Sequence, residues 1–315
     1  MRKFIRKISP FNNETEMASP LYIIKKLLAF FVLYFLGAVI GEGIIFGIFY
    51  AMGYDPLHGE LPDGDWVIRL SYYGYIIQIA LTLLFWRLFE KRRLCDMGLN
   101  KKVGGFLKGV GIAVLLLAVI VAVSCISGVM RFEKISFNAK LSELALWLLA
   151  FAVQSSFEEI LSRGFLQQAL RRKVSLPMAI AVSAAAFSAP HFTTLFTFEK
   201  QYIVLGIVNL LLISGVFSML TVICDNLWIS CGMHALWNYI IYQIMGLSLS
   251  GIDATETGVI RMTVDNANIW YGGEYGLEAG AMCAVVMAVT LAVLILIYHK
   301  KKDGAKWNST TDSIS

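Results

Sequence analysis

The chain has 315 residues, of which 57% are hydrophobic and only 16% are charged, and its mean hydropathy is +0.67. A soluble domain has about 45–50% apolar and about 25% charged residues, so the composition excludes an ordinary soluble enzyme, a disulfide scaffold and a disordered chain. The net charge of +5 does not indicate a nucleic-acid partner, because in a membrane protein the placement of Lys and Arg matters more than their sum. We therefore predict an integral membrane protein.

Apolar stretches long enough to cross a bilayer, which takes roughly 20 residues, recur along the chain. They lie at 27–52, 66–89, 103–130, 141–170, 174–191, 201–223, 226–247 and 280–298. The fold expected from them is all-α, a polytopic transmembrane helical bundle of about eight spans. Four regions follow: a basic N-terminal segment at 1–26, three helices at 27–130, a core at 131–298 and a basic, disordered tail at 299–315.

Charged residues alternate between the connections. Lys and Arg gather in the N-terminal segment, in 91–102, in 171–173 and in 300–302. The other connections carry the acidic residues Asp55, Glu60, Asp63, Asp65, Asp253, Glu256, Asp265, Glu274 and Glu278. With eight crossings, every basic connection falls on one side, which the positive-inside tendency makes cytoplasmic. Both termini are then expected in the cytoplasm.

Two further features of the first spans are explained by structural roles, without catalysis. Trp66, Tyr72, Tyr73 and Tyr75 are typical of an aromatic belt at the membrane interface. Glu42 is an isolated charge between two glycines, and we interpret it as a packing or pore-side polar residue.

Ionisable and amide side chains within three of the apolar stretches are the strongest functional signal. An acidic or basic group at mid-helix costs at least about 2.5–3.5 kcal/mol in a membrane, so such residues are functional candidates by default. They are Glu158, Glu159 and Arg163 in the fourth stretch, His191 at the end of the fifth, and His234 and Asn238 in the seventh.

Helix geometry predicts different roles for the two glutamates. Glu159 and Arg163 are four residues apart, with Glu on the N-terminal side, so they favour an ion pair on one face. Glu158 points about 100° away from Glu159 and is left to face a partner elsewhere. His234 and Asn238, also four apart, share a face, and we expect Glu158, His191, His234 and Asn238 to meet in one polar pocket.

Taken in order, E-E-x-x-x-R, F-x-x-x-H and H-x-x-x-N on successive apolar segments resemble the motifs of the CPBP family. This family, also called Abi, comprises intramembrane peptidases that include CAAX-prenyl-protein endopeptidases and bacteriocin-processing enzymes. The motifs match Glu158-Glu159 with Arg163, Phe187 with His191, and His234 with Asn238. Softer echoes at 92–99 and 272–280 extend the resemblance, whereas the first 90 residues carry none of it.

The resemblance implies hydrolysis of peptide bonds inside the membrane, with 131–298 as the catalytic core. Glu158 is then the base that activates water, and His191 helps to hold that water. His234 and Asn238 supply hydrogen bonds to the developing oxyanion, while Glu159 and Arg163 form a structural pair. Pro190, directly before His191, is a departure that affects the reach of that imidazole.

Several alternatives stay open at the level of the sequence. Glu158, His191 and His234 form a possible zinc ligand set, but there is no H-E-x-x-H, so a metal-free mechanism is equally compatible. The expected partners are the lipid bilayer and a peptide or membrane-protein substrate, either prenylated or of the leader type, and not a nucleic acid. The rival functions are a non-catalytic immunity or binding protein on the same scaffold and a proton-coupled transporter.

Overall fold

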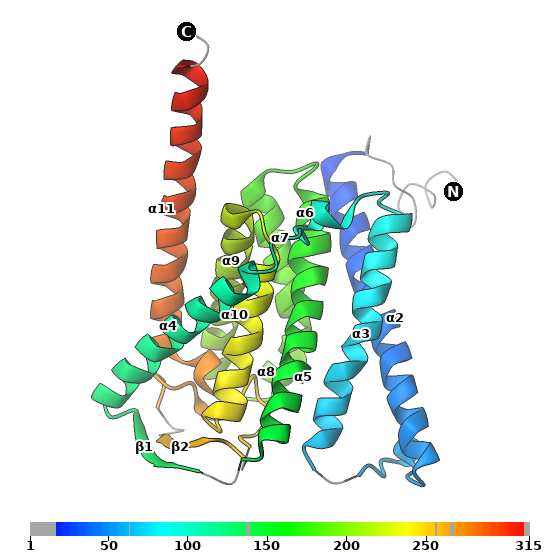
Figure 1. Ribbon diagram of the computed structural model, residues 1–315, viewed down its shortest axis with the longest axis vertical. Helices are drawn as coiled ribbons and strands as arrows, with labels where there is room; N and C mark the ends of the chain where they lie inside the picture. The colour runs from blue at the N-terminus through cyan, green and yellow to red at the C-terminus, as the bar shows by residue number, and fades with distance from the viewer. Residues whose placement is uncertain (1–16, 63, 137–138, 256, 265–267, 312–315) are drawn as a thin grey trace.

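The computed structural model describes residues 17–62, 64–136, 139–255, 257–264 and 268–311, and Figure 1 shows that long helices dominate it. The predicted all-α polytopic bundle is confirmed. The long helices are α2 (Ser19–Ala51), α3 (Trp66–Leu88), α4 (Gly105–Ile126), α5 (Leu141–Glu159), α7 (Leu176–Ser188), α9 (Lys200–Cys224), α10 (Trp228–Tyr239) and α11 (Ala281–Thr311). The start of α2 and the end of α11 lie at the same end of the bundle (Figure 1).

Shorter turns extend or connect these helices. The π-helical η3 (Ile160–Gln167) and α6 (Gln168–Leu170) continue α5, and a second π-helical turn, η5 (Ile240–Ile244), continues α10. The 3-10 turn η4 (Ala189–His191) and α8 (Phe192–Leu195) continue α7. The connections contain η1 (Pro56–His58), η2 (Leu94–Met97), η6 (Gly273–Tyr275) and η7 (Leu277–Ala279).

Among the described residues, seven helices are long and apolar enough to cross a membrane. They correspond to the predicted segments except the seventh, 226–247. That segment forms α10 and η5, which together run only from Trp228 to Ile244, or about 25 Å at 1.5 Å per residue. The seventh predicted span is therefore a shorter helix, packed against α4, α5 and α9 in the interior of the bundle.

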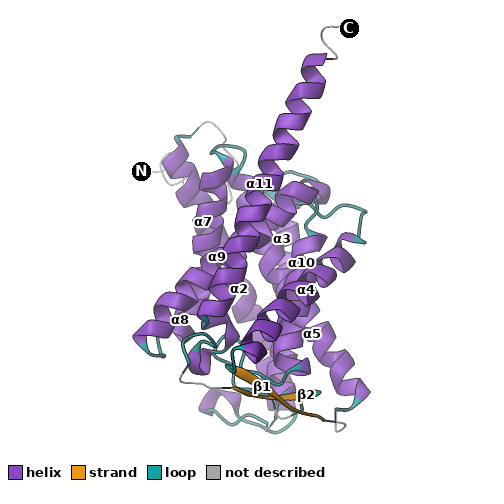
Figure 2. Cartoon of the chain, turned by 90° about the vertical axis from the view of Figure 1, so that its left-hand side faces the viewer, coloured by secondary structure: helices purple, strands orange, loops and turns teal. Residues whose placement is uncertain are grey.

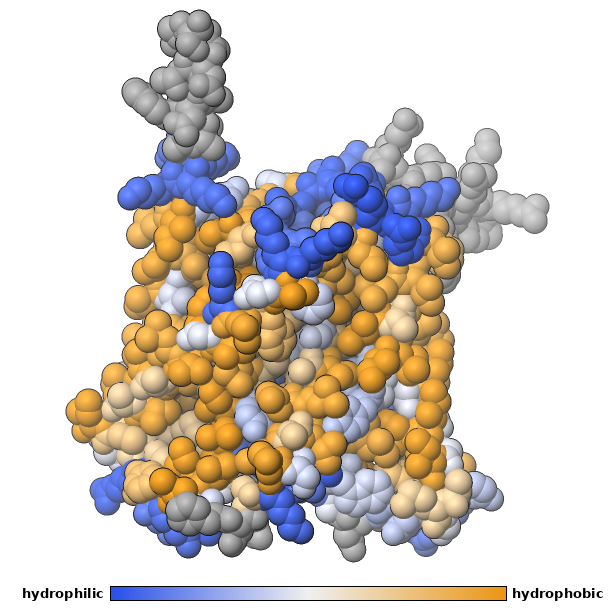
Figure 3. All heavy atoms as spheres, viewed as in Figure 1, coloured by the Kyte–Doolittle hydropathy of each residue, from blue (hydrophilic) through white to orange (hydrophobic). Residues whose placement is uncertain are grey.

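The outer surface of the bundle has the pattern of a protein embedded in lipid. Figure 3 shows an apolar band across the helices, with hydrophilic residues gathered above and below it. Several large apolar side chains of the helices are exposed, including Leu107 on α4, Val39 on α2 and Leu296 on α11, which are 69–71% exposed. Because water would make such exposure unfavourable, the surface supports an integral membrane protein.

The end of the bundle opposite α11's C-terminus carries a small sheet. Strands β1 (Met130–Ile135) and β2 (Ile260–Val264) pair antiparallel, with an irregular register between Phe132 and Lys134. Figure 2 shows the strands beneath the helices, beside the loops at that end. This sheet was not expected from the sequence, because its strands are short and separated by more than 120 residues. Asp63, Glu256 and Asp265 lie outside the described residues.

At the opposite end, the predicted boundaries shift. Helix α2 begins at Ser19, so Lys26 lies inside it, is 1% exposed and forms an ion pair with Glu90, which also binds Arg172 at 3.0 Å. Helix α11 continues to Thr311, so the tail predicted to be disordered is helical up to that residue. Residues 1–16 and 312–315 of the predicted terminal segments lie outside the described residues.

Helices α4 and α10 approach each other closely, and glycines permit the contact. A Cβ atom at Gly109 would collide with the backbone of Ile229 and Met233, and one at Gly232 would collide with the backbone of Phe106. Backbone atoms cannot move aside as a flexible side chain can. The two glycines therefore set the depth at which α10, with its polar residues, lies in the bundle.

We expect Gly109→Ala to lower the free energy of unfolding by about 1–3 kcal/mol, because the added methyl group overpacks the contact between α4 and α10. Thermal unfolding of the detergent-solubilised protein measures the loss. Gly111→Ala is the matched control, since a Cβ atom at Gly111 meets nothing within 4 Å. Equal stabilities of the two variants would contradict a close helix contact at Gly109.

Candidate active site

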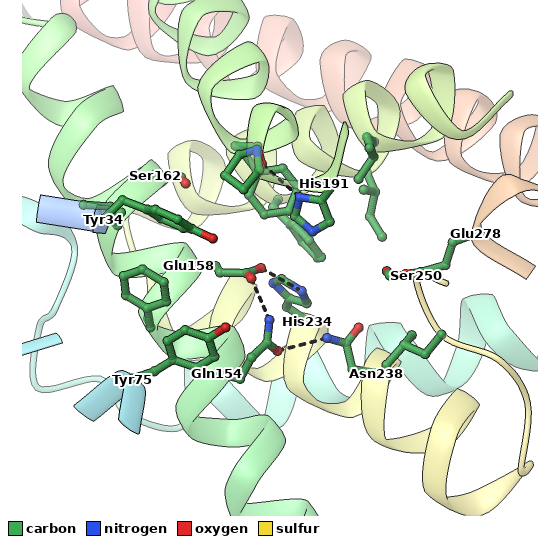
Figure 4. A pocket seen from close by; sticks show the side chains of 18 of the residues that line it. Tyr34, Tyr75, Gln154, Glu158, Ser162, His191, His234, Asn238, Ser250 and Glu278 are labelled. Atoms are coloured by element: carbon green, nitrogen blue, oxygen red, sulfur yellow. Dashed lines mark hydrogen bonds and ion pairs between the residues drawn. The ribbon is translucent and has the colours of Figure 1, made fainter. Parts of the chain in front are cut away.

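A cavity of about 250 Å³ lies between α2, α3, α5, α7, α9, α10 and the loop after η5. Its lining contains both acidic and amide side chains. The polar lining residues other than tyrosines and threonines are Gln154, Glu158, Ser162, His191, His234, Asn238, Ser250 and Glu278. The four residues expected to meet in one pocket, Glu158, His191, His234 and Asn238, all line it, and Figure 4 shows them around its centre.

Glu159 and Arg163 lie behind this cavity as a fully buried ion pair. Arg163 Nη1 donates to Glu159 Oε1 at 3.0 Å, and both side chains are 0% exposed. Arg163 Nη2 donates to Ser214 Oγ on α9 at 2.5 Å. The guanidinium lies 4.3 Å from the ring centre of Phe187 and 5.3 Å from that of Phe217. The predicted pair is therefore present, and contacts from α7 and α9 hold its cation.

The backbone changes from α-helix to π-helix at this pair. Glu159 is the last residue of α5, and Arg163 lies within η3, where all eight residues are buried. Segments of π-helix are rare and occur often at functional sites. The two glutamates still belong to regular α-helix, so the predicted angle of about 100° between them applies.

Glu158 faces the cavity, as the helix geometry predicts. Its side chain is 16% exposed, against 0% for Glu159. Gln154 Nε2 donates to Glu158 Oε1 at 2.7 Å, and Gln154 Oε1 accepts from Asn238 Nδ2 at 3.1 Å. Glu158 Oε2 lies 3.6 Å from His234 Nε2 and has no hydrogen-bond partner within the described chain. Glu158 is thus the one of the two adjacent glutamates whose side chain lines the cavity.

His191 reaches the cavity from the turn that Pro190 begins to form. Its Nδ1 lies 3.1 Å from the backbone oxygen of Phe187, four residues earlier. A carbonyl oxygen can only accept, so Nδ1 carries the proton and Nε2 presents a lone pair. Figure 4 shows that nitrogen on the side of the ring facing Glu158. Pro190 therefore does not remove His191 from the site.

His234 lies between the two carboxylates. Its Nδ1 is 3.1 Å from Glu159 Oε1, and its Nε2 faces Glu158. The ring stacks on Phe217, with ring centres 4.9 Å apart. Because Glu159 accepts from Nδ1, the buried ion pair also fixes which nitrogen of His234 faces the cavity.

The described residues do not form a ready metal site. No group of three or more His, Cys, Asp or Glu among them is arranged to hold a metal ion. Glu158, His191 and His234, which the sequence left open as zinc ligands, line one cavity without forming such a group.

Two interpretations of the first spans differ from the structure. Tyr72 and Tyr75, predicted to be interfacial, line the cavity, and Tyr75 stacks on Phe157 with ring centres 5.1 Å apart. Positions three apart share a helix face, and this face of α3 packs on α5. Glu42 is exposed on α2 and does not line the cavity.

Sequence reasoning missed Gln154, Ser214 and Glu278 as site residues. Gln154 lies four residues before Glu158, so helical spacing offered a signal, whereas Ser214 had none. Glu278 belongs to the second motif echo, 272–280. The first echo, 92–99, supports the site indirectly: the oxygen of Gly98 accepts from the backbone N–H of Leu227, immediately before α10.

Comparison with known proteins identifies one segment. Residues 140–240 match the family model described as type II CAAX prenyl endopeptidase Rce1-like. The segment runs from just before α5 to the first residue of η5, so it contains all three motifs. This confirms the predicted resemblance and supports a CAAX-type intramembrane protease family. No curated protein and no solved structure gives a significant match.

We expect Arg163→Gln to destabilise the protein by about 3–5 kcal/mol, because it leaves Glu159 as an uncompensated buried charge. Thermal unfolding in detergent measures the change. Glu159→Gln combined with Arg163→Gln should recover part of the loss, and Glu158→Gln should unfold near the wild-type temperature. A small effect of Arg163→Gln would show that the pair does not support the fold.

Proposed function

We propose that the chain is an intramembrane endopeptidase that hydrolyses peptide bonds with a water activated by Glu158. The observation that carries the proposal is the different surroundings of the two adjacent glutamates. Glu159 is paired with Arg163 and is 0% exposed, whereas Glu158 lines the cavity, is 16% exposed and forms no ion pair with a described Arg or Lys. A general base needs an accessible carboxylate of this kind.

His191 supports the same role for Glu158. Its Nε2 lone pair accepts a hydrogen bond from the water while Glu158 takes the proton. Two acceptors on one water orient its remaining lone pair toward a carbonyl carbon. Gln154 stabilises this arrangement because its hydrogen bond holds the other oxygen of Glu158 in place.

Asn238 and His234 are the proposed donors to the oxyanion. Gln154 Oε1 occupies one N–H of Asn238 Nδ2 and thereby fixes the orientation of the amide, which leaves the second N–H to donate. With Nδ1 directed at Glu159, the Nε2 of His234 faces the cavity and is the second proposed donor. Preorganised donors of this type stabilise charge that develops in the transition state.

The proposed reaction balances with these groups. Water attacks the carbonyl carbon and its proton passes to Glu158, giving a tetrahedral oxyanion held by His234 and Asn238. The C–N bond then breaks, and Glu158 returns the proton to the leaving amine. The products are a new carboxyl terminus and a new amino terminus.

The bilayer is the proposed surrounding of the site, with both termini in the cytoplasm. The basic residues at the end of the bundle that contains Glu90 and Arg172 support that orientation. The substrate is a membrane-associated peptide, either prenylated or a leader-type segment. No nucleic acid is a proposed partner.

We expect cells with the wild-type protein to produce discrete cleaved peptides that cells with Glu158→Gln lack at equal expression. The change keeps the shape of the side chain but removes the base. Mass spectrometry of membrane and secreted peptides measures the difference. Glu42→Gln is the matched control, because Glu42 is also an intramembrane glutamate but is exposed outside the cavity.

Identical peptide profiles in cells with the wild type, Glu158→Gln and Glu42→Gln would contradict the peptidase proposal. If deletion of the chain still had a phenotype, an immunity, binding or transport role on the same scaffold would take its place.

We expect Asn238→Ala to lower kcat by about 10²–10³-fold, the usual loss for one oxyanion donor. KM should change less, because the donor acts mainly on the transition state. Steady-state kinetics on a peptide identified in the previous experiment measures both constants. An unchanged kcat would remove Asn238 from the proposed chemistry.

A further inference from the structure

A second carboxylate lines the cavity, and the proposed hydrolysis does not use it. Glu278 lies in η7, 120 residues after Glu158 and outside the segment that matches the family model. In Figure 4 it lies with Ser250 on the opposite side of the cavity from Tyr34 and Tyr75. His191 and Asn238 lie between this carboxylate and Glu158 in that view.

Two neutral donors fix the position of Glu278. Trp237 Nε1 donates to Glu278 Oε1 at 3.0 Å, and Ser250 Oγ donates to Oε2 at 2.5 Å. Trp237 is fully buried and directly precedes Asn238 in α10, so the carboxylate is tied to the helix that carries the oxyanion donors. Asn209 Nδ2, from α9, donates to the oxygen of Gly280 at 3.0 Å and anchors the loop beside it. The carboxylate is therefore preorganised.

No cation balances this carboxylate within the described part of the chain. Glu159 has Arg163, and Glu90 has Lys26 and Arg172, but Glu278 forms no ion pair with a described Lys, Arg or His. An acidic group in a partly enclosed cavity without a counter-charge attracts a positive ligand.

The neighbouring phenol does not supply a charge. Burial raises the pKa of Tyr275 above its ordinary value, and the negative charge of Glu278 adds to the rise. Tyr275 is therefore a neutral neighbour of Glu278.

We propose that Glu278 is a specificity-determining residue that binds a lysine or arginine side chain of the peptide substrate near the scissile bond. This inference rests on the proposed peptidase function and adds a substrate class to it. The long apolar stem of Lys or Arg suits the apolar walls, and its charged group pairs with the carboxylate. A free carboxylate of the substrate at the same place is repelled.

Glu278 also has a structural role, since it joins the loop to α10 through Trp237. The variant Glu278→Gln separates the two roles. The Gln carbonyl oxygen still accepts from Trp237, so the loop keeps that support while the negative charge is lost. Glu278→Asp keeps the charge on a shorter side chain and serves as the conservative rescue variant.

The test uses the full-length protein in liposomes and a set of apolar peptides, acetylated at the N-terminus and amidated at the C-terminus. The peptides differ only in carrying Lys, norleucine or Glu at successive positions, so that one side chain supplies the charge. We expect the wild type to cleave a Lys peptide with about tenfold higher kcat/KM than its norleucine counterpart, as one charge-assisted contact provides. Glu278→Gln should reduce this ratio to near one, and Glu278→Asp should retain part of it.

Glu274→Gln is the matched control, because Glu274 is an exposed acid in the same loop. The ratio of kcat/KM for a Lys peptide to that for its norleucine counterpart should be the same in this variant as in the wild type. Cleavage without a Lys preference, or a preference that survives in Glu278→Gln, overturns the subsite and leaves the peptidase proposal standing. If the wild type and Glu158→Gln both cleave none of the peptides, the peptidase proposal and the subsite fail together.

Discussion

The site depends on one interaction, the buried ion pair between Glu159 and Arg163. Neither side chain is exposed, so each charge is tolerated only because the other is present. Arg163 also binds Ser214 on α9 and lies over the ring of Phe187 on α7. Glu159 accepts from His234 on α10. A pair on one continuous helix thus positions three other helices.

The same pair gives Glu158 its distinct surroundings. Arg163 forms its ion pair with Glu159. Glu158 points about 100° away from Glu159, so its carboxylate lines the cavity instead. Close packing through Gly109 and Gly232 holds α10, which carries His234 and Asn238, against α4. Polar side chains are energetically unfavourable inside a membrane. Hydrogen bonds from the surrounding helices offset part of this unfavourable free energy.

The cavity has acidic groups at two places, and they differ in their supports. Glu158 is held by an amide, Gln154, and faces a histidine, an arrangement suited to proton transfer. Glu278 is held by an indole N–H and a hydroxyl, which each donate to one of its oxygens and fix the carboxylate in place. The difference in surroundings underlies the separate roles that we propose for them, base and cation-binding subsite.

The sequence by itself determined the class of fold and named the polar residues that the cavity brings together. Apolar segment length indicated the helical bundle, and i, i+4 spacing indicated both the Glu159–Arg163 pair and the cavity-facing Glu158, since these depend on local geometry. Tertiary structure decided the rest. Distances along separate helices say nothing about how helices pack. Only the fold therefore showed that Tyr75 is a cavity wall, that α10 is a short helix inside the bundle, and that Ser214 and Glu278 reach the site from distant segments.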